Sequence, residues 1–189
     1  MKPNILLGID LGTSSCKSIL LDPRGNCLGV ATQEYAIQTP QPGWAEQDPN
    51  EWIRAAASTI HRVIDLAAVD PKQICAIGLT GQMHSLVCLD QHRQVLRPAI
   101  LWADQRSALE VQQVLRQIGR QRLGQWTGNP VATGFMLVSW LWLSKHEPEV
   151  AHKTHLLLLP KDYLRCWLTG LTGSEPSDAS STLLFDPIH

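Results

Sequence analysis

The first forty residues alternate between short apolar runs and clusters of turn-forming residues, and this pattern constrains the fold more than any other feature. Apolar, strand-like runs cover 5–9, 18–21 and 27–37. They are separated by Asp-Leu-Gly-Thr-Ser-Ser and by Asp-Pro-Arg-Gly-Asn, which are rich in residues that favour tight turns. Tight turns join antiparallel neighbours. The segment 4–38 therefore predicts a three-stranded antiparallel meander.

A helix with a well-marked start follows the meander. Asp48 is a good N-cap, Pro49 suits the first turn, and Glu51 stands three residues after the cap. Helical spacing of the apolar residues then predicts one buried stripe. The stripe consists of Trp52, Ala56, Ile60, Val63 and Ala67. A second apolar run, 74–79, predicts a buried strand, so that the helix serves as a crossover.

The remaining sequence predicts further extended and helical segments. Extended runs cover 86–89 and 100–102. Helical patterns cover about 105–118, 134–146 and 160–169, and the residues from Gly170 onward, rich in Gly, Ser, Thr and Pro, predict loop. A meander followed by a crossover helix favours an α/β fold on a mixed sheet with flanking helices.

The composition excludes several classes of protein. A net charge of −1 over 189 residues provides no general attraction for nucleic acid or an anionic membrane. The longest apolar run, 135–143, is too short to span a bilayer, and the N-terminus lacks the apolar core of a signal peptide. The five cysteines form no Cys-x-x-Cys pair, which favours a reducing cytoplasm over a disulfide framework or a metal cluster.

The turn after the first apolar run is a candidate phosphate site. Gly12 would allow a close approach of the backbone to an anion, and Thr13 and Ser14 add hydroxyl donors to the backbone N–H groups of the turn. Asp10 is placed to hold Mg²⁺, directly or through water, and Lys17 could neutralise phosphate charge. The alternative is a plain hairpin turn, since the same residue types favour turns anyway.

Two later segments could bind a polyol. Gln82 and His84 directly follow the predicted strand at 74–79, where α/β sheets commonly place ligand contacts. Trp102 offers a flat face for a sugar, and Asp104 offers a strong acceptor for hydroxyl groups. The alternatives are a loop or core histidine for His84, and a core tryptophan followed by a helix N-cap for Trp102 and Asp104.

Six stretches of the chain, taken in order, are similar to motifs of the FGGY carbohydrate kinases, and most closely to members that act on D-xylulose. The similarity runs from residue 8 to about residue 186. The stretches are Gly-Ile-Asp-Leu-Gly-Thr-Ser (8–14), Gly-Trp-Ala-Glu-Gln-Asp-Pro (43–49), Gly-Gln-Met-His (81–84), Leu-Trp-Ala-Asp-Gln-Arg (101–106), Leu-Pro-Lys-Asp-Tyr-Leu (159–164) and Ser-Glu-Pro-Ser-Asp-Ala-Ser (174–180).

This resemblance implies an actin-like ATPase fold of the ribonuclease-H-like type, in which two domains enclose a cleft for ATP and a sugar. The residues expected to face the phosphates and Mg²⁺ are Asp10, Gly12, Thr13, Ser14 and Lys17. The implied reaction transfers the γ-phosphoryl group of ATP to a ketopentose, converting D-xylulose to D-xylulose 5-phosphate.

The resemblance also assigns the sugar contacts. Met83 and His84 match the sugar contacts of the D-xylulose enzymes, whereas glycerol kinases carry an Arg-Glu pair at these positions. Gln82 adjoins this pair, and Trp102 and Asp104 match the wall of the sugar pocket. The Met-His pair therefore favours a ketopentose over glycerol, with ribulose, gluconate and glycerol as alternative substrates.

In the family, the general-base aspartate comes from a segment beyond 174–180, so we expect it beyond residue 189. On this basis residues 1–189 form an incomplete N-terminal FGGY kinase domain without the C-terminal domain. We expect little turnover by this part alone, with self-association or pairing with a C-terminal half. A non-catalytic sugar-binding module or a truncated relic is the alternative from another functional class.

Overall fold

The computed structural model describes residues 4–187, which divide into two compact units. Unit 1 comprises residues 4–36 and 50–82, and unit 2 comprises residues 37–49 and 83–187. Within residues 4–187, no helix is both long enough and apolar enough to cross a membrane.

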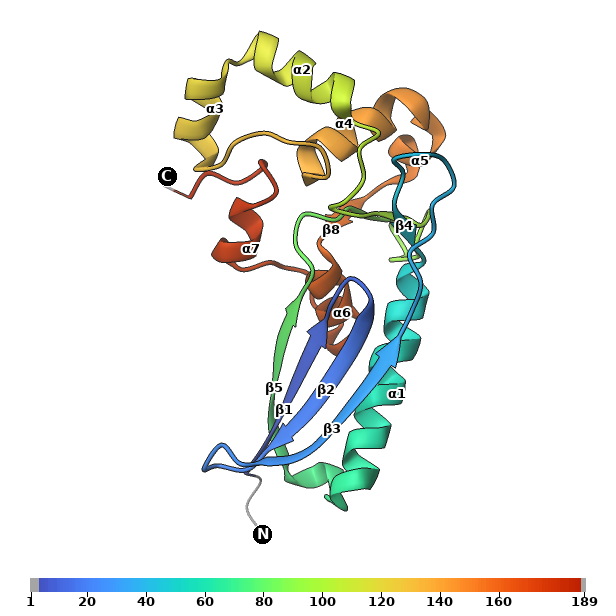
Figure 1. The fold of residues 1–189 in the computed structure, drawn as a ribbon, viewed down its shortest axis with the longest axis vertical. Coiled ribbons are helices and arrows are strands. Elements are labelled where there is room, and N and C mark those ends of the chain that lie inside the picture. The colour runs from blue at the N-terminus through green and yellow to red at the C-terminus, as the bar shows by residue number, and fades with distance from the viewer. Residues whose placement is uncertain (1–3, 188–189) are drawn as a thin grey trace. The chain divides into compact units, whose positions relative to one another are not determined.

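Unit 1 is a four-stranded mixed sheet with a long helix beside it (Figure 1). The antiparallel meander and the crossover helix predicted from the sequence are both confirmed, because three strands pair in antiparallel order and the fourth runs parallel to the first. In sheet order the strands are β3 (Cys27–Glu34), β2 (Ser15–Leu21), β1 (Ile5–Leu11) and β5 (Ile74–Gly81). The crossover consists of α1 (Pro49–Ala67) and the 3₁₀ turn η1 (Pro71–Gln73).

Helix α1 covers one face of this sheet. Alternate residues of β1 are buried, as expected for a strand with one covered face. The hydroxyls of Ser18 on β2 and Thr59 on α1 share a 2.8 Å hydrogen bond, which satisfies two buried polar groups. The predicted stripe is confirmed at Trp52, Ala56 and Val63, which are completely buried. Its other two members, Ile60 and Ala67, are only partly buried.

Strand β5 corrects one prediction, because it is largely exposed instead of buried. The side chain of Ile77 is 48% exposed, and most of the strand's residues are accessible. The strand lies at the edge of the sheet and pairs only with β1 among residues 4–187. A short apolar run has the same appearance in a central strand and in an edge strand, so the pattern could not distinguish them.

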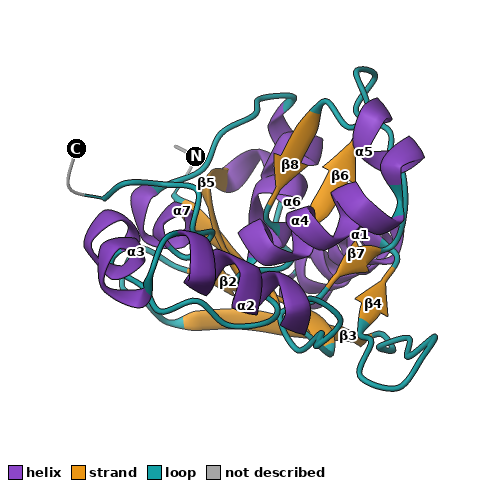
Figure 2. Ribbon diagram, turned by 90° about the horizontal axis from the view of Figure 1, so that it is seen from above, coloured by secondary structure: helices purple, strands orange, loops and turns teal. Residues whose placement is uncertain are grey.

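Unit 2 combines two small antiparallel sheets with six helices (Figure 2). The strand pairs are β4 (Glu46–Gln47) with β7 (Ala99–Ile100), and β6 (Val87–Leu89) with β8 (Leu156–Leu158). The helices are α2 (Ala108–Gln117), α3 (Arg120–Thr127), α4 (Met136–His146), α5 (Pro148–Lys153), α6 (Pro160–Thr169) and α7 (Pro176–Ser180).

The helices predicted near 105–118, 134–146 and 160–169 are confirmed as α2, α4 and α6. The prediction that all residues from Gly170 onward form loop is wrong, because α7 lies there. The carboxylate of Glu175 accepts hydrogen bonds from the N–H groups of Ser177 and Asp178, and this cap satisfies the first turn of a very short helix.

The core of unit 2 forms where α4 packs against the strands. It contains Leu86, Cys88, Ile100, Met136, Trp142, Leu143 and Leu159. Ile100 of β7 belongs to this core, so the core fixes the backbone just before Trp102.

Candidate functional site

In unit 1, the exposed face of strands β2, β1 and β5 carries an ammonium group, a carboxylate and a hydroxyl in one row. Asp10 pairs with Lys17 on β2 and with Thr80 on β5. Directly paired residues point to the same face of a sheet, and this is the face opposite α1. A hollow of about 310 Å³ is lined by these three residues together with Gly8 and Gly78, whose lack of side chains leaves it open.

The turn that joins β1 to β2 is fixed by bonds within unit 1. The N–H of Gly12 donates to the carbonyl of Ser15 over 3.0 Å, and the N–H of Tyr35 donates to the carbonyl of Ser14 over 3.0 Å. The hydroxyl of Tyr35 donates to the carbonyl of Gly12 over 2.6 Å. Burial raises the pKa of Tyr35, so its hydroxyl stays protonated as the donor.

This geometry changes the role predicted for Gly12. Its N–H closes the hairpin, so it is not available to an anion, and a Cβ at this position would lie 3.2 Å from the carbonyl of Ser15. The glycine is explained by the tightness of the turn. Ser14 is exposed at the tip and Thr13 is partly buried beside it. Sequence reasoning missed Tyr35, which lies in the predicted third strand and carried no signal of this contact.

The surroundings of Asp10 fit a bound Mg²⁺. The residue is exposed, and within residues 4–187 its carboxylate forms no hydrogen bond or ion pair. Mg²⁺ is a hard cation that prefers carboxylate oxygens and keeps several of its waters.

In unit 2, His84 is held in an unusual backbone conformation by contacts with two distant segments. Its φ angle is 61°, a region that few residues other than glycine adopt. Its Nδ1 lies 2.9 Å from the carbonyl oxygen of Ser181. Its ring stacks on Phe135 with centroids 4.1 Å apart and planes inclined by 30°. Backbone strain of this kind persists only where the surroundings determine it, and it is common at ligand sites.

Met83 and Trp102 lie on segments that one hydroxyl ties together. Ser85 Oγ accepts a 3.1 Å hydrogen bond from the N–H of Trp102 and donates a 3.2 Å hydrogen bond to the carbonyl of Met83. The side chains of Met83 and Trp102 are 54% and 46% exposed, which is unusual for large apolar groups. The interpretation of Trp102 as a core residue is therefore wrong.

Gly134 completes this neighbourhood. Its φ angle is 81°, and a Cβ built there would lie 1.8 Å from the carbonyl oxygen of Trp102. Only glycine allows such a close approach of two backbone segments. The structure thus brings Met83, His84 and Trp102 together through Ser85, Gly134, Phe135 and Ser181. Ser85 directly follows the predicted Gln-Met-His stretch, whereas sequence reasoning missed Gly134, Phe135 and Ser181, because they are ordinary residue types in segments far apart.

Gln82 and Asp104 have surroundings different from those expected. Gln82 is buried in unit 1, where its N–H donates to the carbonyl of Leu11 over 2.8 Å and continues the β1–β5 pairing. Asp104 is only 1% exposed, and its carboxylate accepts from the N–H of Ala45 and the guanidinium of Arg106. A sugar contact by Asp104 therefore does not fit this geometry, and its partners give it a structural role. It is not a helix cap either, because α2 begins at Ala108.

Arg106 is the centre of a buried charge network that joins two of the matched motifs. Its guanidinium pairs with Asp104 and with Glu46, at 2.7 Å in each case, and it lies over the ring of Trp44 at 3.6 Å from the centroid. Arg97 pairs with Glu46 as well, so the carboxylate of Glu46 has two cationic partners. The segments 43–49 and 101–106 therefore fold against each other.

The other two matched motifs of unit 2 meet at Lys161. Its Nζ lies 2.6 Å from the carboxylate of Asp162 on α6, and 3.4 Å from that of Asp178 on α7. Burial would lower the pKa of Lys161, but the hydrogen bond to Asp162 and the negative charges around it outweigh this and raise it. Burial raises the pKa of Asp178, and Lys161 offsets only part of this effect.

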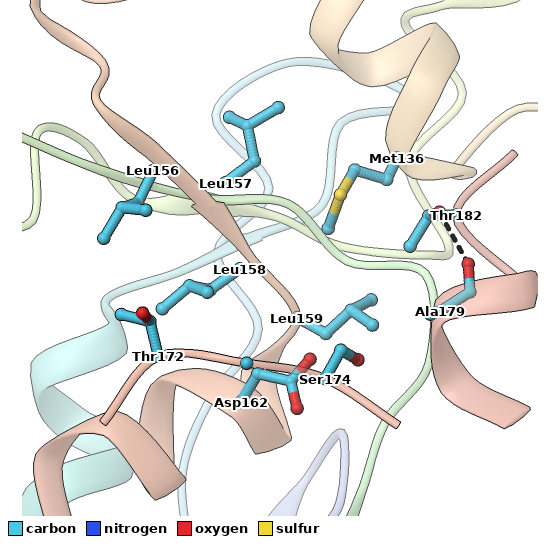
Figure 3. A pocket seen from close by; sticks show the side chains of 11 residues that line it. Met136, Leu156, Leu157, Leu158, Leu159, Asp162, Thr172, Ser174, Ala179 and Thr182 are labelled. Atoms are coloured by element: carbon cyan, nitrogen blue, oxygen red, sulfur yellow. Dashed lines mark hydrogen bonds between the residues drawn. The ribbon is translucent and has the colours of Figure 1, made fainter. Parts of the chain in front are cut away.

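A cavity of about 320 Å³ adjoins this cluster (Figure 3). In Figure 3 the side chains of Asp162 and Ser174 lie close to each other, with Leu158 and Leu159 of the neighbouring segment beside them. The Asp162 carboxylate on this wall is already paired with Lys161, and most of the other lining residues are apolar. The cavity thus offers little chemistry of its own.

Comparison with known proteins identifies the class of protein. The model of the FGGY family of carbohydrate kinases, N-terminal domain, matches residues 5–188. The chain therefore belongs to the FGGY family of carbohydrate kinases, as the motifs predicted. The structural neighbours confirm the predicted actin-like ATPase fold.

Individual relatives and solved structures give the extent of the similarity. The chain is 45% identical over 181 residues to the xylulose kinase of Lactococcus lactis, covering 96% of this chain and 36% of that protein. The crystal structure of a kinase from Brucella ovis, described as a xyloylose kinase, is 40% identical with a TM-score of 0.90, over 96% of this chain and 37% of that one. A gluconate kinase from Lactobacillus acidophilus is 27% identical with a TM-score of 0.90, over 96% and 36%. The chain thus spans little more than a third of the length of these relatives.

Proposed function

We propose that this chain provides the sugar-binding loops and the phosphate-binding hairpin of an FGGY kinase that transfers the γ-phosphoryl group of ATP to D-xylulose. The observation that carries the proposal is the neighbourhood of Met83, His84 and Trp102, two of which expose large apolar side chains beside a strained histidine. The xylulose kinase of Lactococcus lactis, 45% identical, supports the choice of sugar.

In the sugar half, each residue offers a different kind of contact. Trp102 offers a flat apolar face, which suits the C–H face of a sugar, and Met83 offers a second apolar surface. The ring nitrogen Nε2 of His84 forms no hydrogen bond within residues 4–187, so it can serve a hydroxyl group of the substrate. Gln82 contributes to the site only by connecting this loop to β5.

In the phosphate half, Asp10 would hold Mg²⁺ and Lys17 would neutralise phosphate charge. Ser14 at the exposed tip, with Thr13 beside it, would donate hydrogen bonds to phosphate oxygens. Such a transfer depends mostly on positioning and charge neutralisation, with a carboxylate that takes the hydroxyl proton. We assign no residue of 4–187 to that last role. The five cysteines are all unpaired, which agrees with the reducing cytoplasm that we propose as the location.

A different sugar is the second candidate function. The structural match to a gluconate kinase, with a TM-score of 0.90, is as good as the match to the Brucella ovis enzyme, although its sequence identity is lower. The overall fold of the chain therefore does not choose between the substrates. The Met83–His84 pair is the feature that favours a ketopentose.

A panel of sugars distinguishes the candidates. We expect D-xylulose to bind more tightly than D-ribulose, D-gluconate and glycerol in calorimetric titrations. Tighter binding of D-gluconate or glycerol would overturn the choice of sugar. An assay of ADP formation from Mg·ATP with each sugar then separates a kinase from a sugar-binding module, because only the kinase releases ADP in proportion to the sugar.

A further inference from the structure

The contact between His84 and Ser181 determines which ring nitrogen of His84 carries the proton. A backbone carbonyl oxygen can only accept a hydrogen bond, so Nδ1, at 2.9 Å from it, must be the donor. In the neutral ring the other nitrogen, Nε2, then carries the lone pair and is an acceptor. His84 is thus poised to receive a hydrogen bond from a ligand through Nε2.

The carbonyl of Ser181 is itself held in place by its neighbours. The carbonyl of Ser180 accepts a 2.8 Å hydrogen bond from the side-chain amide of Asn129, and the carbonyl of Thr182 accepts a 3.1 Å hydrogen bond from the N–H of Leu137. Three consecutive carbonyls, 180–182, are therefore engaged by donors from three different segments. This makes Ser181 a fixed acceptor.

Phe135 fixes the remaining freedom of the ring. Its ring centroid lies 4.1 Å from that of His84, and the residue packs against the cluster of Val114, Leu123 and Val138. A stacked neighbour on one face and a hydrogen bond at Nδ1 leave a single orientation that satisfies both. Rotation of the ring by 180° about its Cβ–Cγ bond would remove Nδ1 from Ser181.

We propose that Phe135 and the carbonyl of Ser181 are positioning groups for sugar recognition, which hold His84 with its proton on Nδ1 so that Nε2 accepts a hydrogen bond from a substrate hydroxyl. This inference rests on the proposed function and adds a rule of substrate specificity to it. The substrate must present an O–H group at this position. A carbonyl, ether or O-methyl group there offers no proton, and two acceptors would face each other.

The direct test is a long-range ¹H–¹⁵N spectrum of the histidine rings of the sugar-free protein at about pH 8.5, where an unperturbed histidine is neutral. The signal of His84 is assigned with His84→Ala. We expect a single Nδ1–H tautomer in the wild type. Phe135→Leu should give a mixture of tautomers and weaken D-xylulose binding by about tenfold, the loss of one hydrogen bond. Phe135→Tyr keeps the stacked face and should restore both.

The spectrum separates this inference from the proposed function. An Nε2–H tautomer in the wild type, or an unchanged tautomer in a folded Phe135→Leu variant, would overturn the positioning role whatever the sugar does. Far-ultraviolet circular dichroism and the unfolding midpoint confirm that each variant is folded. If the Nδ1–H tautomer is present but D-xylulose does not bind, the proposed function fails instead. Mono-O-methyl derivatives of D-xylulose complete the test, and the inference requires that one of them binds at least tenfold more weakly.

Discussion

In unit 1, Asp10 and Lys17 are held by the regular hydrogen bonding of a hairpin, whereas in unit 2, Met83, His84 and Trp102 are held by residues from distant segments. The hairpin site consists of exposed groups on a sheet whose opposite face is buried under α1. The segments that carry Met83, His84 and Trp102 depend instead on hydrogen bonds to a hydroxyl and a carbonyl, on a stacked ring and on a glycine contact. We therefore expect this group of residues in unit 2 to be more sensitive to substitution than the hairpin, because single contacts hold it in place.

The largest expected effect is the slow reaction of buried cysteines, which tests whether the core of each unit excludes solvent and reagents. Burial raises the pKa of Cys88 in unit 2 to about 11, and it also raises that of Cys16 in unit 1. The reactive form is the thiolate, so both should react with Ellman's reagent on the order of 100-fold or more slowly than exposed Cys27. Mass spectrometry of digested samples gives the rate at each site.

The two buried cysteines also show how readily each unit opens relative to the other. A Cys88 that reacts much faster than Cys16 would show that unit 2 opens independently, as its dependence on single contacts suggests. Labelling of both at the rate of Cys27 would contradict the burial described for these residues.

Next in size is the removal of Arg106. Arg106→Ala leaves the buried carboxylates of Asp104 and Glu46 without their shared partner, which should cost about 3–5 kcal/mol of unfolding free energy. Arg116→Ala is the control, since Arg116 is exposed on α2 of the same unit, so a change within about 0.5 kcal/mol is expected. Urea unfolding followed by tryptophan fluorescence measures both. Equal effects would mean that the network does not stabilise unit 2.

A smaller effect is expected from Gly134→Ala. Its φ angle of 81° and the backbone of Trp102 both oppose a side chain, and we expect a loss of about 3 kcal/mol. Gly170→Ala in the same unit is a matched control, because its φ angle of 71° and ψ angle of 3° are left-handed and the nearest atom lies 4.0 Å from the added Cβ, which limits the loss to about 1 kcal/mol. Thermal unfolding compares the two variants. The same midpoint for both would show that the contact with Trp102 is dispensable.

The sequence allowed much of unit 1 to be predicted, because the meander and α1 depend on local patterns. Turn residues mark the ends of the strands, and the N-cap at Asp48 marks the start of the helix. The exposure of β5 could not be predicted, because an apolar run has no feature that reports how many neighbours a strand has. Helix α7 was missed because it has only five residues, which is too few for a helical pattern of apolar residues to be recognised; it is capped by the side chain of Glu175.

The candidate site shows the limits of motif resemblance more clearly. The order of the motifs located Met83, His84 and Trp102, which the structure brings together in unit 2. The same resemblance assigned Asp104 to the sugar, although its carboxylate is occupied by Arg106 and Ala45. A residue of a family motif can support the structure around a site, or it can contact the ligand. Only the contacts of that residue in the structure distinguish the two roles.

Titration calorimetry with D-xylulose, applied to the wild type, His84→Ala and His92→Ala, tests most directly whether unit 2 carries a sugar site. His92 lies in an exposed turn of the same unit and is the matched control. We predict that D-xylulose binds to the wild type and to His92→Ala equally, and at least about tenfold more weakly to His84→Ala. Equal binding to all three, or no binding by a wild-type protein shown to be folded, would contradict it.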